Sequence, residues 1–142
     1  MSNAVGRGRP AYHTSDFQRL LGSRADSFRL RRLVLPDGDT DAEVLSVVLT
    51  DRDGAVAEVR GTSDGVRMVL VATERGEIDM ADYGKVTELP LPFAAGGRHH
   101  VTSVRHILGA TSTELILGFD HLPAWSILNR ADRLRVTEVT PD

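Results

Sequence analysis

From Phe28 onward, short apolar segments alternate with turn-forming sequences every eight to twelve residues, and this rhythm restricts the chain to a fold of many short strands. The turns are rich in Gly, Pro and Asp, as in PDGDTD at 36–41, DRDG at 51–54, TSDG at 62–65, ERG at 74–76 and AAGG at 94–97. The segments between them predict strands at 28–35, 43–50, 55–60, 66–73, 77–80, 85–91, 101–108, 113–119, 124–128 and 133–140.

The character of these segments predicts their places in a sheet. LSVVL, RMVLVA and ELILG are apolar on both faces, as in strands covered on each side. KVTELPLP ends in prolines, which cannot donate to a ladder, so it belongs at an edge or a strand end. We therefore expect a mainly β fold, an antiparallel small barrel or sandwich of about eight to ten short strands; the sequence leaves barrel and sandwich open.

One segment allows two interpretations. In residues 98–109, Val101, Val104 and Leu108 also suit a helix that ends at Gly109. The β-branched content of the segment favours a strand.

The N-terminal part differs from the rest. Residues 1–13 have no hydrophobic periodicity and predict a flexible arm, followed by a single β-rich domain at 14–142. A short helix is expected at 14–22, because Thr14 or Ser15 can cap it, Phe17, Leu20 and Leu21 fall on one face, and Gly22 can end it. The chain has no cysteine and so no disulfides, and its 142 residues suffice for a core without them.

Charge is divided between the two ends of the chain. Residues 1–32 hold seven arginines and two aspartates, a net of +5, whereas the remainder holds ten basic and eighteen acidic residues, a net of −8. A basic arm on an acidic body predicts binding to an acidic partner, most simply another copy of the same chain.

The arm also has a short resemblance to a known motif. Arg7-Gly8-Arg9-Pro10 resembles the core of the AT-hook, which binds AT-rich DNA by laying arginines along the narrow minor groove. The likeness covers four residues, and the flanks lack the further basic residues that the motif usually has. In FRLRRLVLP, the arginines add to this charge, so the predicted partner- or nucleic-acid-binding set is Arg7, Arg9, Arg29, Arg31 and Arg32.

An enzyme is the alternative class. In STELILGFDHLPAW, a carboxylate and a histidine occur beside an apolar strand, and a neighbouring strand carries another histidine. A histidine near a carboxylate can serve as a general base. The candidate proton-transfer residues are His106, Glu114, Asp120 and His121.

Metal and cofactor sites are not expected. The histidines of HHVTSVRH are too far apart along a strand or a helix for one pair to chelate an ion. The acidic turns at 36–43 and 51–54 lack the spacing of an EF-hand, with Ala42 and Val48 where a glycine and a carboxylate are needed, and are interpreted as solvated hairpin ends.

These observations favour a non-enzymatic binding or assembly module with a basic arm. A small β-barrel enzyme or small-molecule binder and a DNA-binding protein are the alternatives. No apolar run approaches the ~20 residues that span a bilayer, and no signal-peptide stretch occurs, so a cytoplasmic protein that binds no membrane is expected.

Overall fold

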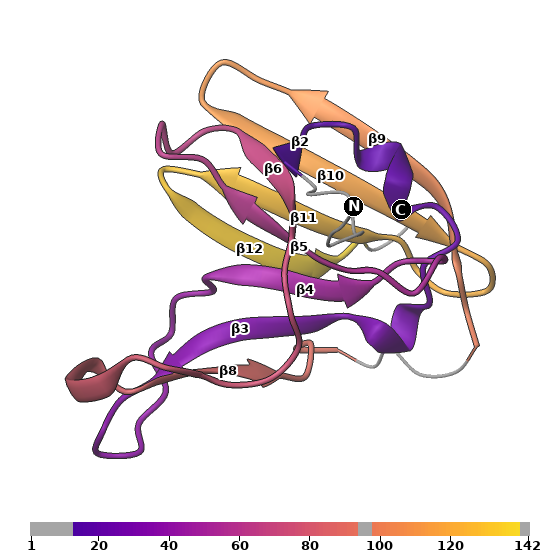
Figure 1. The fold of residues 1–142 in the computed structure, drawn as a ribbon. Coiled ribbons are helices and arrows are strands. Elements are labelled where there is room, and N and C mark those ends of the chain that lie inside the picture. The colour runs from indigo at the N-terminus through magenta and orange to yellow at the C-terminus, as the bar shows by residue number, and fades with distance from the viewer. Residues whose placement is uncertain (1–12, 94–97, 140–142) are drawn as a thin grey trace, which may run out of the picture.

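The computed structural model describes residues 13–93 and 98–139 as two antiparallel β-sheets packed face to face, the larger of them curled into a half-barrel (Figure 1). Each of the ten predicted strands overlaps one strand of the structure, and β2 adds an eleventh in the described ranges. Residues 101–108 form a strand over their whole length, which confirms the β interpretation of this segment.

The larger sheet has the order β2-β6-β5-β4-β3-β8-β7. All its pairings are antiparallel. β3 lies between β4, the next strand in the chain, and β8, which is far from it in the sequence. The strands are β2 (His13–Thr14), β3 (Arg29–Val34), β4 (Ser46–Thr50), β5 (Val56–Gly61), β6 (Met68–Ala72), β7 (Ile78–Asp79) and β8 (Lys85–Leu89).

The smaller sheet is a meander with the order β12-β11-β10-β9. A register shift between Gly118 and Phe119 bends β10 where it pairs with β9. The strands are β9 (Val101–Leu108), β10 (Ser112–Phe119), β11 (Trp125–Arg130) and β12 (Arg133–Glu138).

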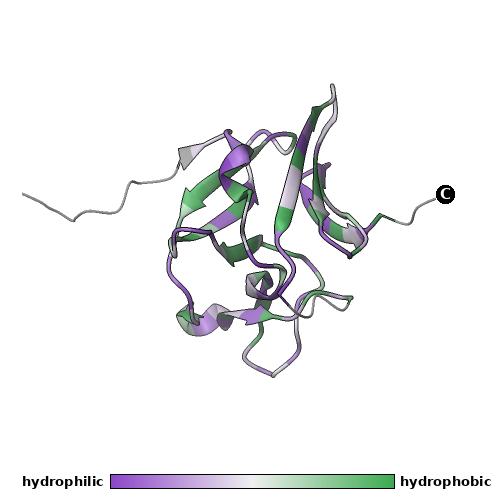
Figure 2. Cartoon of the chain, turned by 90° about the vertical axis from the view of Figure 1, so that its right-hand side faces the viewer, coloured by the Kyte–Doolittle hydropathy of each residue, from purple (hydrophilic) through white to green (hydrophobic). Residues whose placement is uncertain are grey.

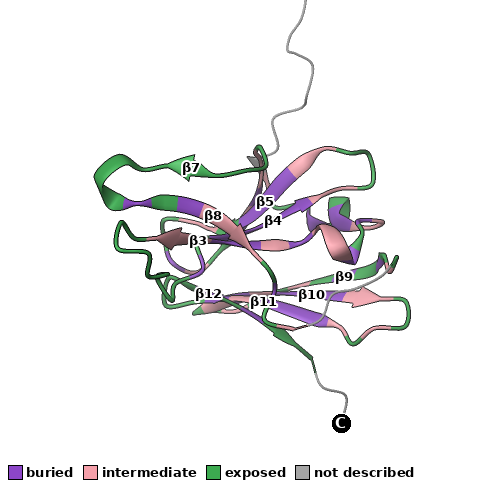
Figure 3. Ribbon diagram, turned by 90° about the horizontal axis from the view of Figure 1, so that it is seen from below, coloured by how far each residue is buried: buried purple, intermediate pink, exposed green. Residues whose placement is uncertain are grey.

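The core fills the space between the two sheets, where Figure 3 shows the buried residues. Trp125 of β11 is 1% exposed and contacts Phe28, which precedes β3, edge-on with 5.3 Å between ring centroids. Phe119 of β10 contacts the same indole at 4.1 Å. Hydrophobic and hydrophilic residues alternate along β12, as in a strand buried on one face, whereas β4 is apolar at three consecutive positions and buried on both faces (Figure 2).

The expected helix at 14–22 is reduced to one turn of 3-10 helix, η1 (Phe17–Leu20). Thr14 is drawn into β2 by its pairing with Leu70, and Asp16, not Thr14 or Ser15, caps the turn by accepting from the Gln18 N–H. Gly22 then donates to the Val101 carbonyl, and Ser23 accepts from the Val101 N–H. The chain after Gly22 therefore lies beside the start of β9 instead of continuing a helix. Two further 3-10 turns are η2 (Ala25–Ser27) and η3 (Ala81–Tyr83).

The face of the larger sheet opposite the smaller sheet is crossed by residues 73–77, which we call the strap. The strap leaves β6, passes in front of β4 and β3 in Figure 1, and ends at β7, the edge strand at the other end of the sheet from β2. The larger sheet is thus packed against the smaller sheet on one face and crossed by the strap, in front of β3 and β4, on the other (Figure 1).

Candidate interaction surface

Two connections protrude together from one end of the larger sheet, at the lower left of Figure 1. The first is the β3–β4 loop. Gly38, with a φ of 94°, turns the chain so that the Leu35 N–H donates to the Asp39 carbonyl, and the Asp37 carboxylate accepts from the Asp39 N–H. Such a turn keeps its aspartates in water at the tip of the loop.

The second connection is the β7–η3–β8 hairpin. Its glycine, Gly84, has a φ of 113°, and a Cβ built there would lie 2.1 Å from the Val34 carbonyl oxygen. Only glycine allows this approach, so the hairpin lies directly against the end of β3. The Asp79 carboxylate accepts from the Ala81 N–H and holds the turn.

Between the two connections lies a groove of about 260 Å³, whose lining includes Leu35, Pro36, Glu77, Asp79 and Lys85. We call residues 35–41 and 77–85 the acidic lobe. The acidic lobe carries six carboxylates against a single lysine: Asp37, Asp39, Asp41, Glu77, Asp79 and Asp82, with Lys85.

The acidic lobe is also unusually apolar for a protruding part of the surface. Within the described ranges, eight large hydrophobic side chains are exposed, and four of these belong to the lobe: Leu35, Ile78, Met80 and Tyr83. Tyr83 is 75% exposed. Figure 3 shows the exposed hairpin around β7 beyond the buried strands. Apolar groups gathered beside carboxylates are typical of a surface that binds a partner.

A buried polar network fixes the strap that leads into the lobe. Arg31 of β3 is 3% exposed, and its guanidinium donates to Glu58 Oε2 of β5 at 3.0 Å and to Thr73 Oγ1 at 2.9 Å. It also donates to the Glu74 carbonyl, and Ser46 Oγ donates to Glu58 Oε2 at 2.7 Å. The network therefore ties the strap to three neighbouring strands.

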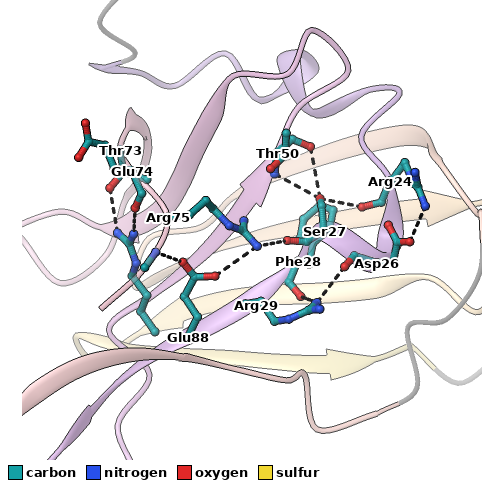
Figure 4. A network of polar contacts seen from close by, with 12 residues as sticks. Arg24, Asp26, Ser27, Phe28, Arg29, Thr50, Thr73, Glu74, Arg75 and Glu88 are labelled. Atoms are coloured by element: carbon teal, nitrogen blue, oxygen red, sulfur yellow. Dashed lines mark hydrogen bonds and ion pairs between the residues drawn. The ribbon is translucent and has the colours of Figure 1, made fainter. Parts of the chain in front are cut away.

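The next residue of the strap continues this attachment (Figure 4). Arg75 forms an ion pair of 3.2 Å with Glu88 of β8 and donates to the Ser27 carbonyl at 2.9 Å. Burial lowers the pKa of Arg75 below its ordinary value, against the opposing effect of Glu88. Glu88 Oε2 also accepts from the Gly76 N–H, immediately before the acidic lobe begins.

The structure places the predicted arginines in different surroundings. Arg7 and Arg9 lie outside the described residues. Arg31, expected on an exposed basic face, is instead buried, because Glu58 and the strap carbonyl satisfy its guanidinium. Arg29 is half-buried and donates to the carbonyls of Asp26 and Phe28, and Arg32 points to the opposite face of β3.

The predicted proton-transfer residues are not gathered in one place. His106 lies on the core side of β9, whereas Glu114 of β10 lies on the outer face of the same sheet and accepts from Ser126 Oγ at 2.5 Å. Asp120 and His121 lie in the β10–β11 turn, five and six residues beyond Leu115, the partner of His106. At ~3.4 Å per residue, that is about 17 Å along the strand from His106 to Asp120.

Two of these groups have shifted pKa values. Burial lowers the pKa of His106, whose ring is edge-on to Phe17 and whose Nε2 has no partner in the described part of the chain. The His100 N–H, which donates to Asp120 Oδ1 at 2.9 Å, lowers the pKa of that carboxyl. The imidazole of His99 also lies beside Asp120, with its Nδ1 3.6 Å from Asp120 Oδ1.

The acidic lobe itself was not predicted as a binding surface. Its first loop was interpreted as a solvated hairpin end, and the exposed apolar residues of the second were not recognised. The signal is in the sequence, since GEIDMADYGK interleaves three acids with Ile78, Met80 and Tyr83 over a stretch too short and too polar to be a core strand.

Comparison with known proteins gives no match: no family model, no curated protein and no solved structure is similar to the chain. Residues 13–93 and 98–139 contain no helix long and apolar enough to cross a membrane. In the same ranges, His, Cys, Asp and Glu side chains form no group of three or more that could hold a metal ion.

Proposed function

We propose that the chain is a non-enzymatic assembly module in which the basic arm of one copy binds the acidic lobe of a neighbouring copy. The observation that carries this proposal is the composition of the lobe, where six carboxylates surround exposed apolar side chains at the end of the larger sheet.

The arm has the complementary chemistry. Residues 5–12 contain Arg7 and Arg9 and no carboxylate, and they end in Pro10, Ala11 and Tyr12. Arginine pairs with carboxylates through its planar fork and packs against aromatic rings such as that of Tyr83. The apolar residues of the arm match the groove beside Leu35 and Pro36, so charge and burial favour the same contact.

The topology favours a neighbouring copy over the same copy as the partner. The arm enters the fold at β2, and β2 and the β7 hairpin lie at opposite edges of the larger sheet. To reach its own lobe the arm would have to cross the whole width of this sheet, one face of which is packed against the smaller sheet and the other crossed by the strap (Figure 1). A head-to-tail contact between copies brings the two edges together and produces a ring or an open chain.

The test is the mass in solution by light scattering, for the full chain and for a chain without residues 1–12. Because exposed ion pairs contribute ~0.2–1 kcal/mol each and are screened by salt, we expect the full chain to be an oligomer at low salt and to dissociate at high salt. The shortened chain should be a monomer at both salt concentrations.

A matched pair of variants locates the contact. The double variant E77Q/D82N removes two lobe charges and should weaken the oligomer severalfold, whereas D53N/E138Q removes two exposed charges outside the lobe and should leave the oligomer unchanged. A full chain that is monomeric at low salt overturns the proposal. If that monomer binds duplex DNA and the shortened chain does not, the arm serves nucleic acid instead.

A further inference from the structure

A second cavity, of about 380 Å³, lies between the two sheets on the other side of the β3–β4 loop. Its apolar wall is made of core residues from both sheets: Leu30 of β3, Val44 of the loop, and Leu134 and Val136 of β12. The cavity lies at β12, the edge strand of the smaller sheet, where Val44 of the β3–β4 loop forms a single antiparallel bridge with Leu134. Its volume is in the range of cavities that hold small ligands.

A cation without a partner lines this cavity. Arg32 lies on the core face of β3, its Nε is buried, and no described residue accepts a hydrogen bond from it or forms an ion pair with it. The side chain as a whole is half-buried, but its Nε is a buried donor without an acceptor in the described residues, and a bound anion would supply that acceptor. The Nε of Arg31, the preceding residue, is also buried without a partner, but its two terminal nitrogens donate to Glu58, Thr73 and the Glu74 carbonyl, as described above.

The charges around the cavity define the ligand further. Its lining also includes Arg133 and Arg135, at exposed positions of β12, and Asp41 and Glu43 of the loop, so with Arg32 it contains three cations and two carboxylates. The surplus is a single positive charge, which suits a monoanion better than a phosphate with two charges. A carboxylate matches the guanidinium fork, and the core side chains match an apolar body.

We propose that this cavity binds a small monocarboxylic acid with an apolar body, its carboxylate on the Arg32 guanidinium and its apolar part against Leu30, Leu134 and Val136. The site is separate from the acidic lobe and does not depend on the arm. A fatty acid of medium chain length and an aryl carboxylate both have this chemistry, and the experiment compares the two.

The test titrates the full chain with octanoate, benzoate and, as the uncharged match, octanol, followed by calorimetry and by amide chemical shifts. We expect saturable binding of at least one carboxylate, with shifts at β3, β12 and residues 41–44, and binding of octanol weaker by about tenfold or more. Equal binding of octanol, or shifts elsewhere on the molecule, overturns the proposal.

Variants separate the roles of charge and space. R32L replaces the guanidinium by an apolar side chain and should weaken carboxylate binding by about tenfold or more. R105L, at an exposed position of β9, should leave carboxylate binding unchanged. A42W places a large ring from an exposed loop position that lines the cavity, so it should block both carboxylate and octanol without altering the core. Unchanged carboxylate binding by R32L or by A42W contradicts the assignment.

Discussion

The ring of His106 lies edge-on to Phe17, with 4.8 Å between the ring centroids, on the core side of β9. Burial lowers its pKa from the ordinary 6.5, and the positive charge of Arg67 acts in the same direction. Between the lowered pKa and 6.5, the unfolded chain binds more protons than the folded chain. The stabilisation by neutral His106 is therefore complete above pH 6.5 and is lost as the pH falls through the lowered value.

The variant H106L removes this titration. We expect the free energy of unfolding of the unchanged protein to fall more steeply than that of H106L when urea denaturation is repeated from about pH 7 to about pH 5. The variant H100Q, at an exposed position, serves as the control and should keep the steeper dependence. Equal slopes for H106L and the unchanged protein would show that His106 is not the group responsible.

Gly84 is the residue on which the position of the acidic lobe depends. In G84A the new methyl group meets the Val34 carbonyl oxygen and the φ of 113° is strained. Gly76 provides a matched comparison, because its φ is 108° but nothing lies within 4 Å of a Cβ built there. We expect G76A to cost ~1–2 kcal/mol of stability and G84A clearly more, with faster amide exchange in residues 77–85 of G84A only. Equal costs would mean that β3 yields to the methyl group.

At the scale of single elements, the strands were predictable because each is marked twice, by β-branched apolar residues and by the turn that follows. The turn at 36–41 needs Gly38 in a left-handed conformation, and the sequence places a glycine there. The segment at 14–22 was not predictable, because Phe17 and Leu20 are spaced for either kind of helix. Distant pairings with β6 and β9 decide its conformation, and no local pattern reports them.

The candidate site, too, is predictable only where local sequence determines it. The charges of the acidic lobe can be read from the sequence, but the contact of its two connections cannot, because β3 pairs with β8 across about fifty intervening residues. Arg31 is the clearest case. Its alternation with Leu30 and Arg32 predicts the face of β3 on which it lies. Its burial on that face depends on the strap, which follows β6 in the chain and which no local pattern in β3 predicts.

The strap depends on Arg31, and the element can be tested through this residue. R31M leaves Glu58 buried without its main cation, which we expect to cost ~3–5 kcal/mol, and it removes the hydrogen bonds from the guanidinium to Thr73 Oγ1 and to the Glu74 carbonyl. R60M is the control, since Arg60 also reaches Glu58, at 3.5 Å, but from an exposed position, and its loss should cost under ~1 kcal/mol.

The double variant R31M/E58Q shows whether the unpaired charge is the cause. Removing the carboxylate together with the guanidinium should recover a large part of the stability lost in R31M, as measured by urea denaturation. Faster amide exchange in residues 73–77 should accompany R31M and not R60M. If R31M and R60M lose the same stability, the strap does not depend on Arg31.

At the scale of the whole molecule, the two sheets share the core that lies between them. The single tryptophan, Trp125, belongs to the smaller sheet, but its indole also contacts Phe28 at the start of β3 in the larger sheet. A cross-sheet hydrogen bond of 2.9 Å from the Asn129 amide to the Arg67 carbonyl adds a polar tie near the far end of the same layer. Neither sheet can therefore unfold without exposing the core face of the other.

This arrangement predicts one cooperative unfolding transition. Trp125 fluorescence reports the environment between the sheets, and far-ultraviolet circular dichroism reports the strands of both, so the two urea curves should coincide. The variant F28L should move both midpoints together to lower urea, because it removes contacts with Trp125 from the opposite sheet and costs about 1 kcal/mol or more. Fluorescence that changes before the circular dichroism would show that the sheets separate first, and that each keeps its strands without the other.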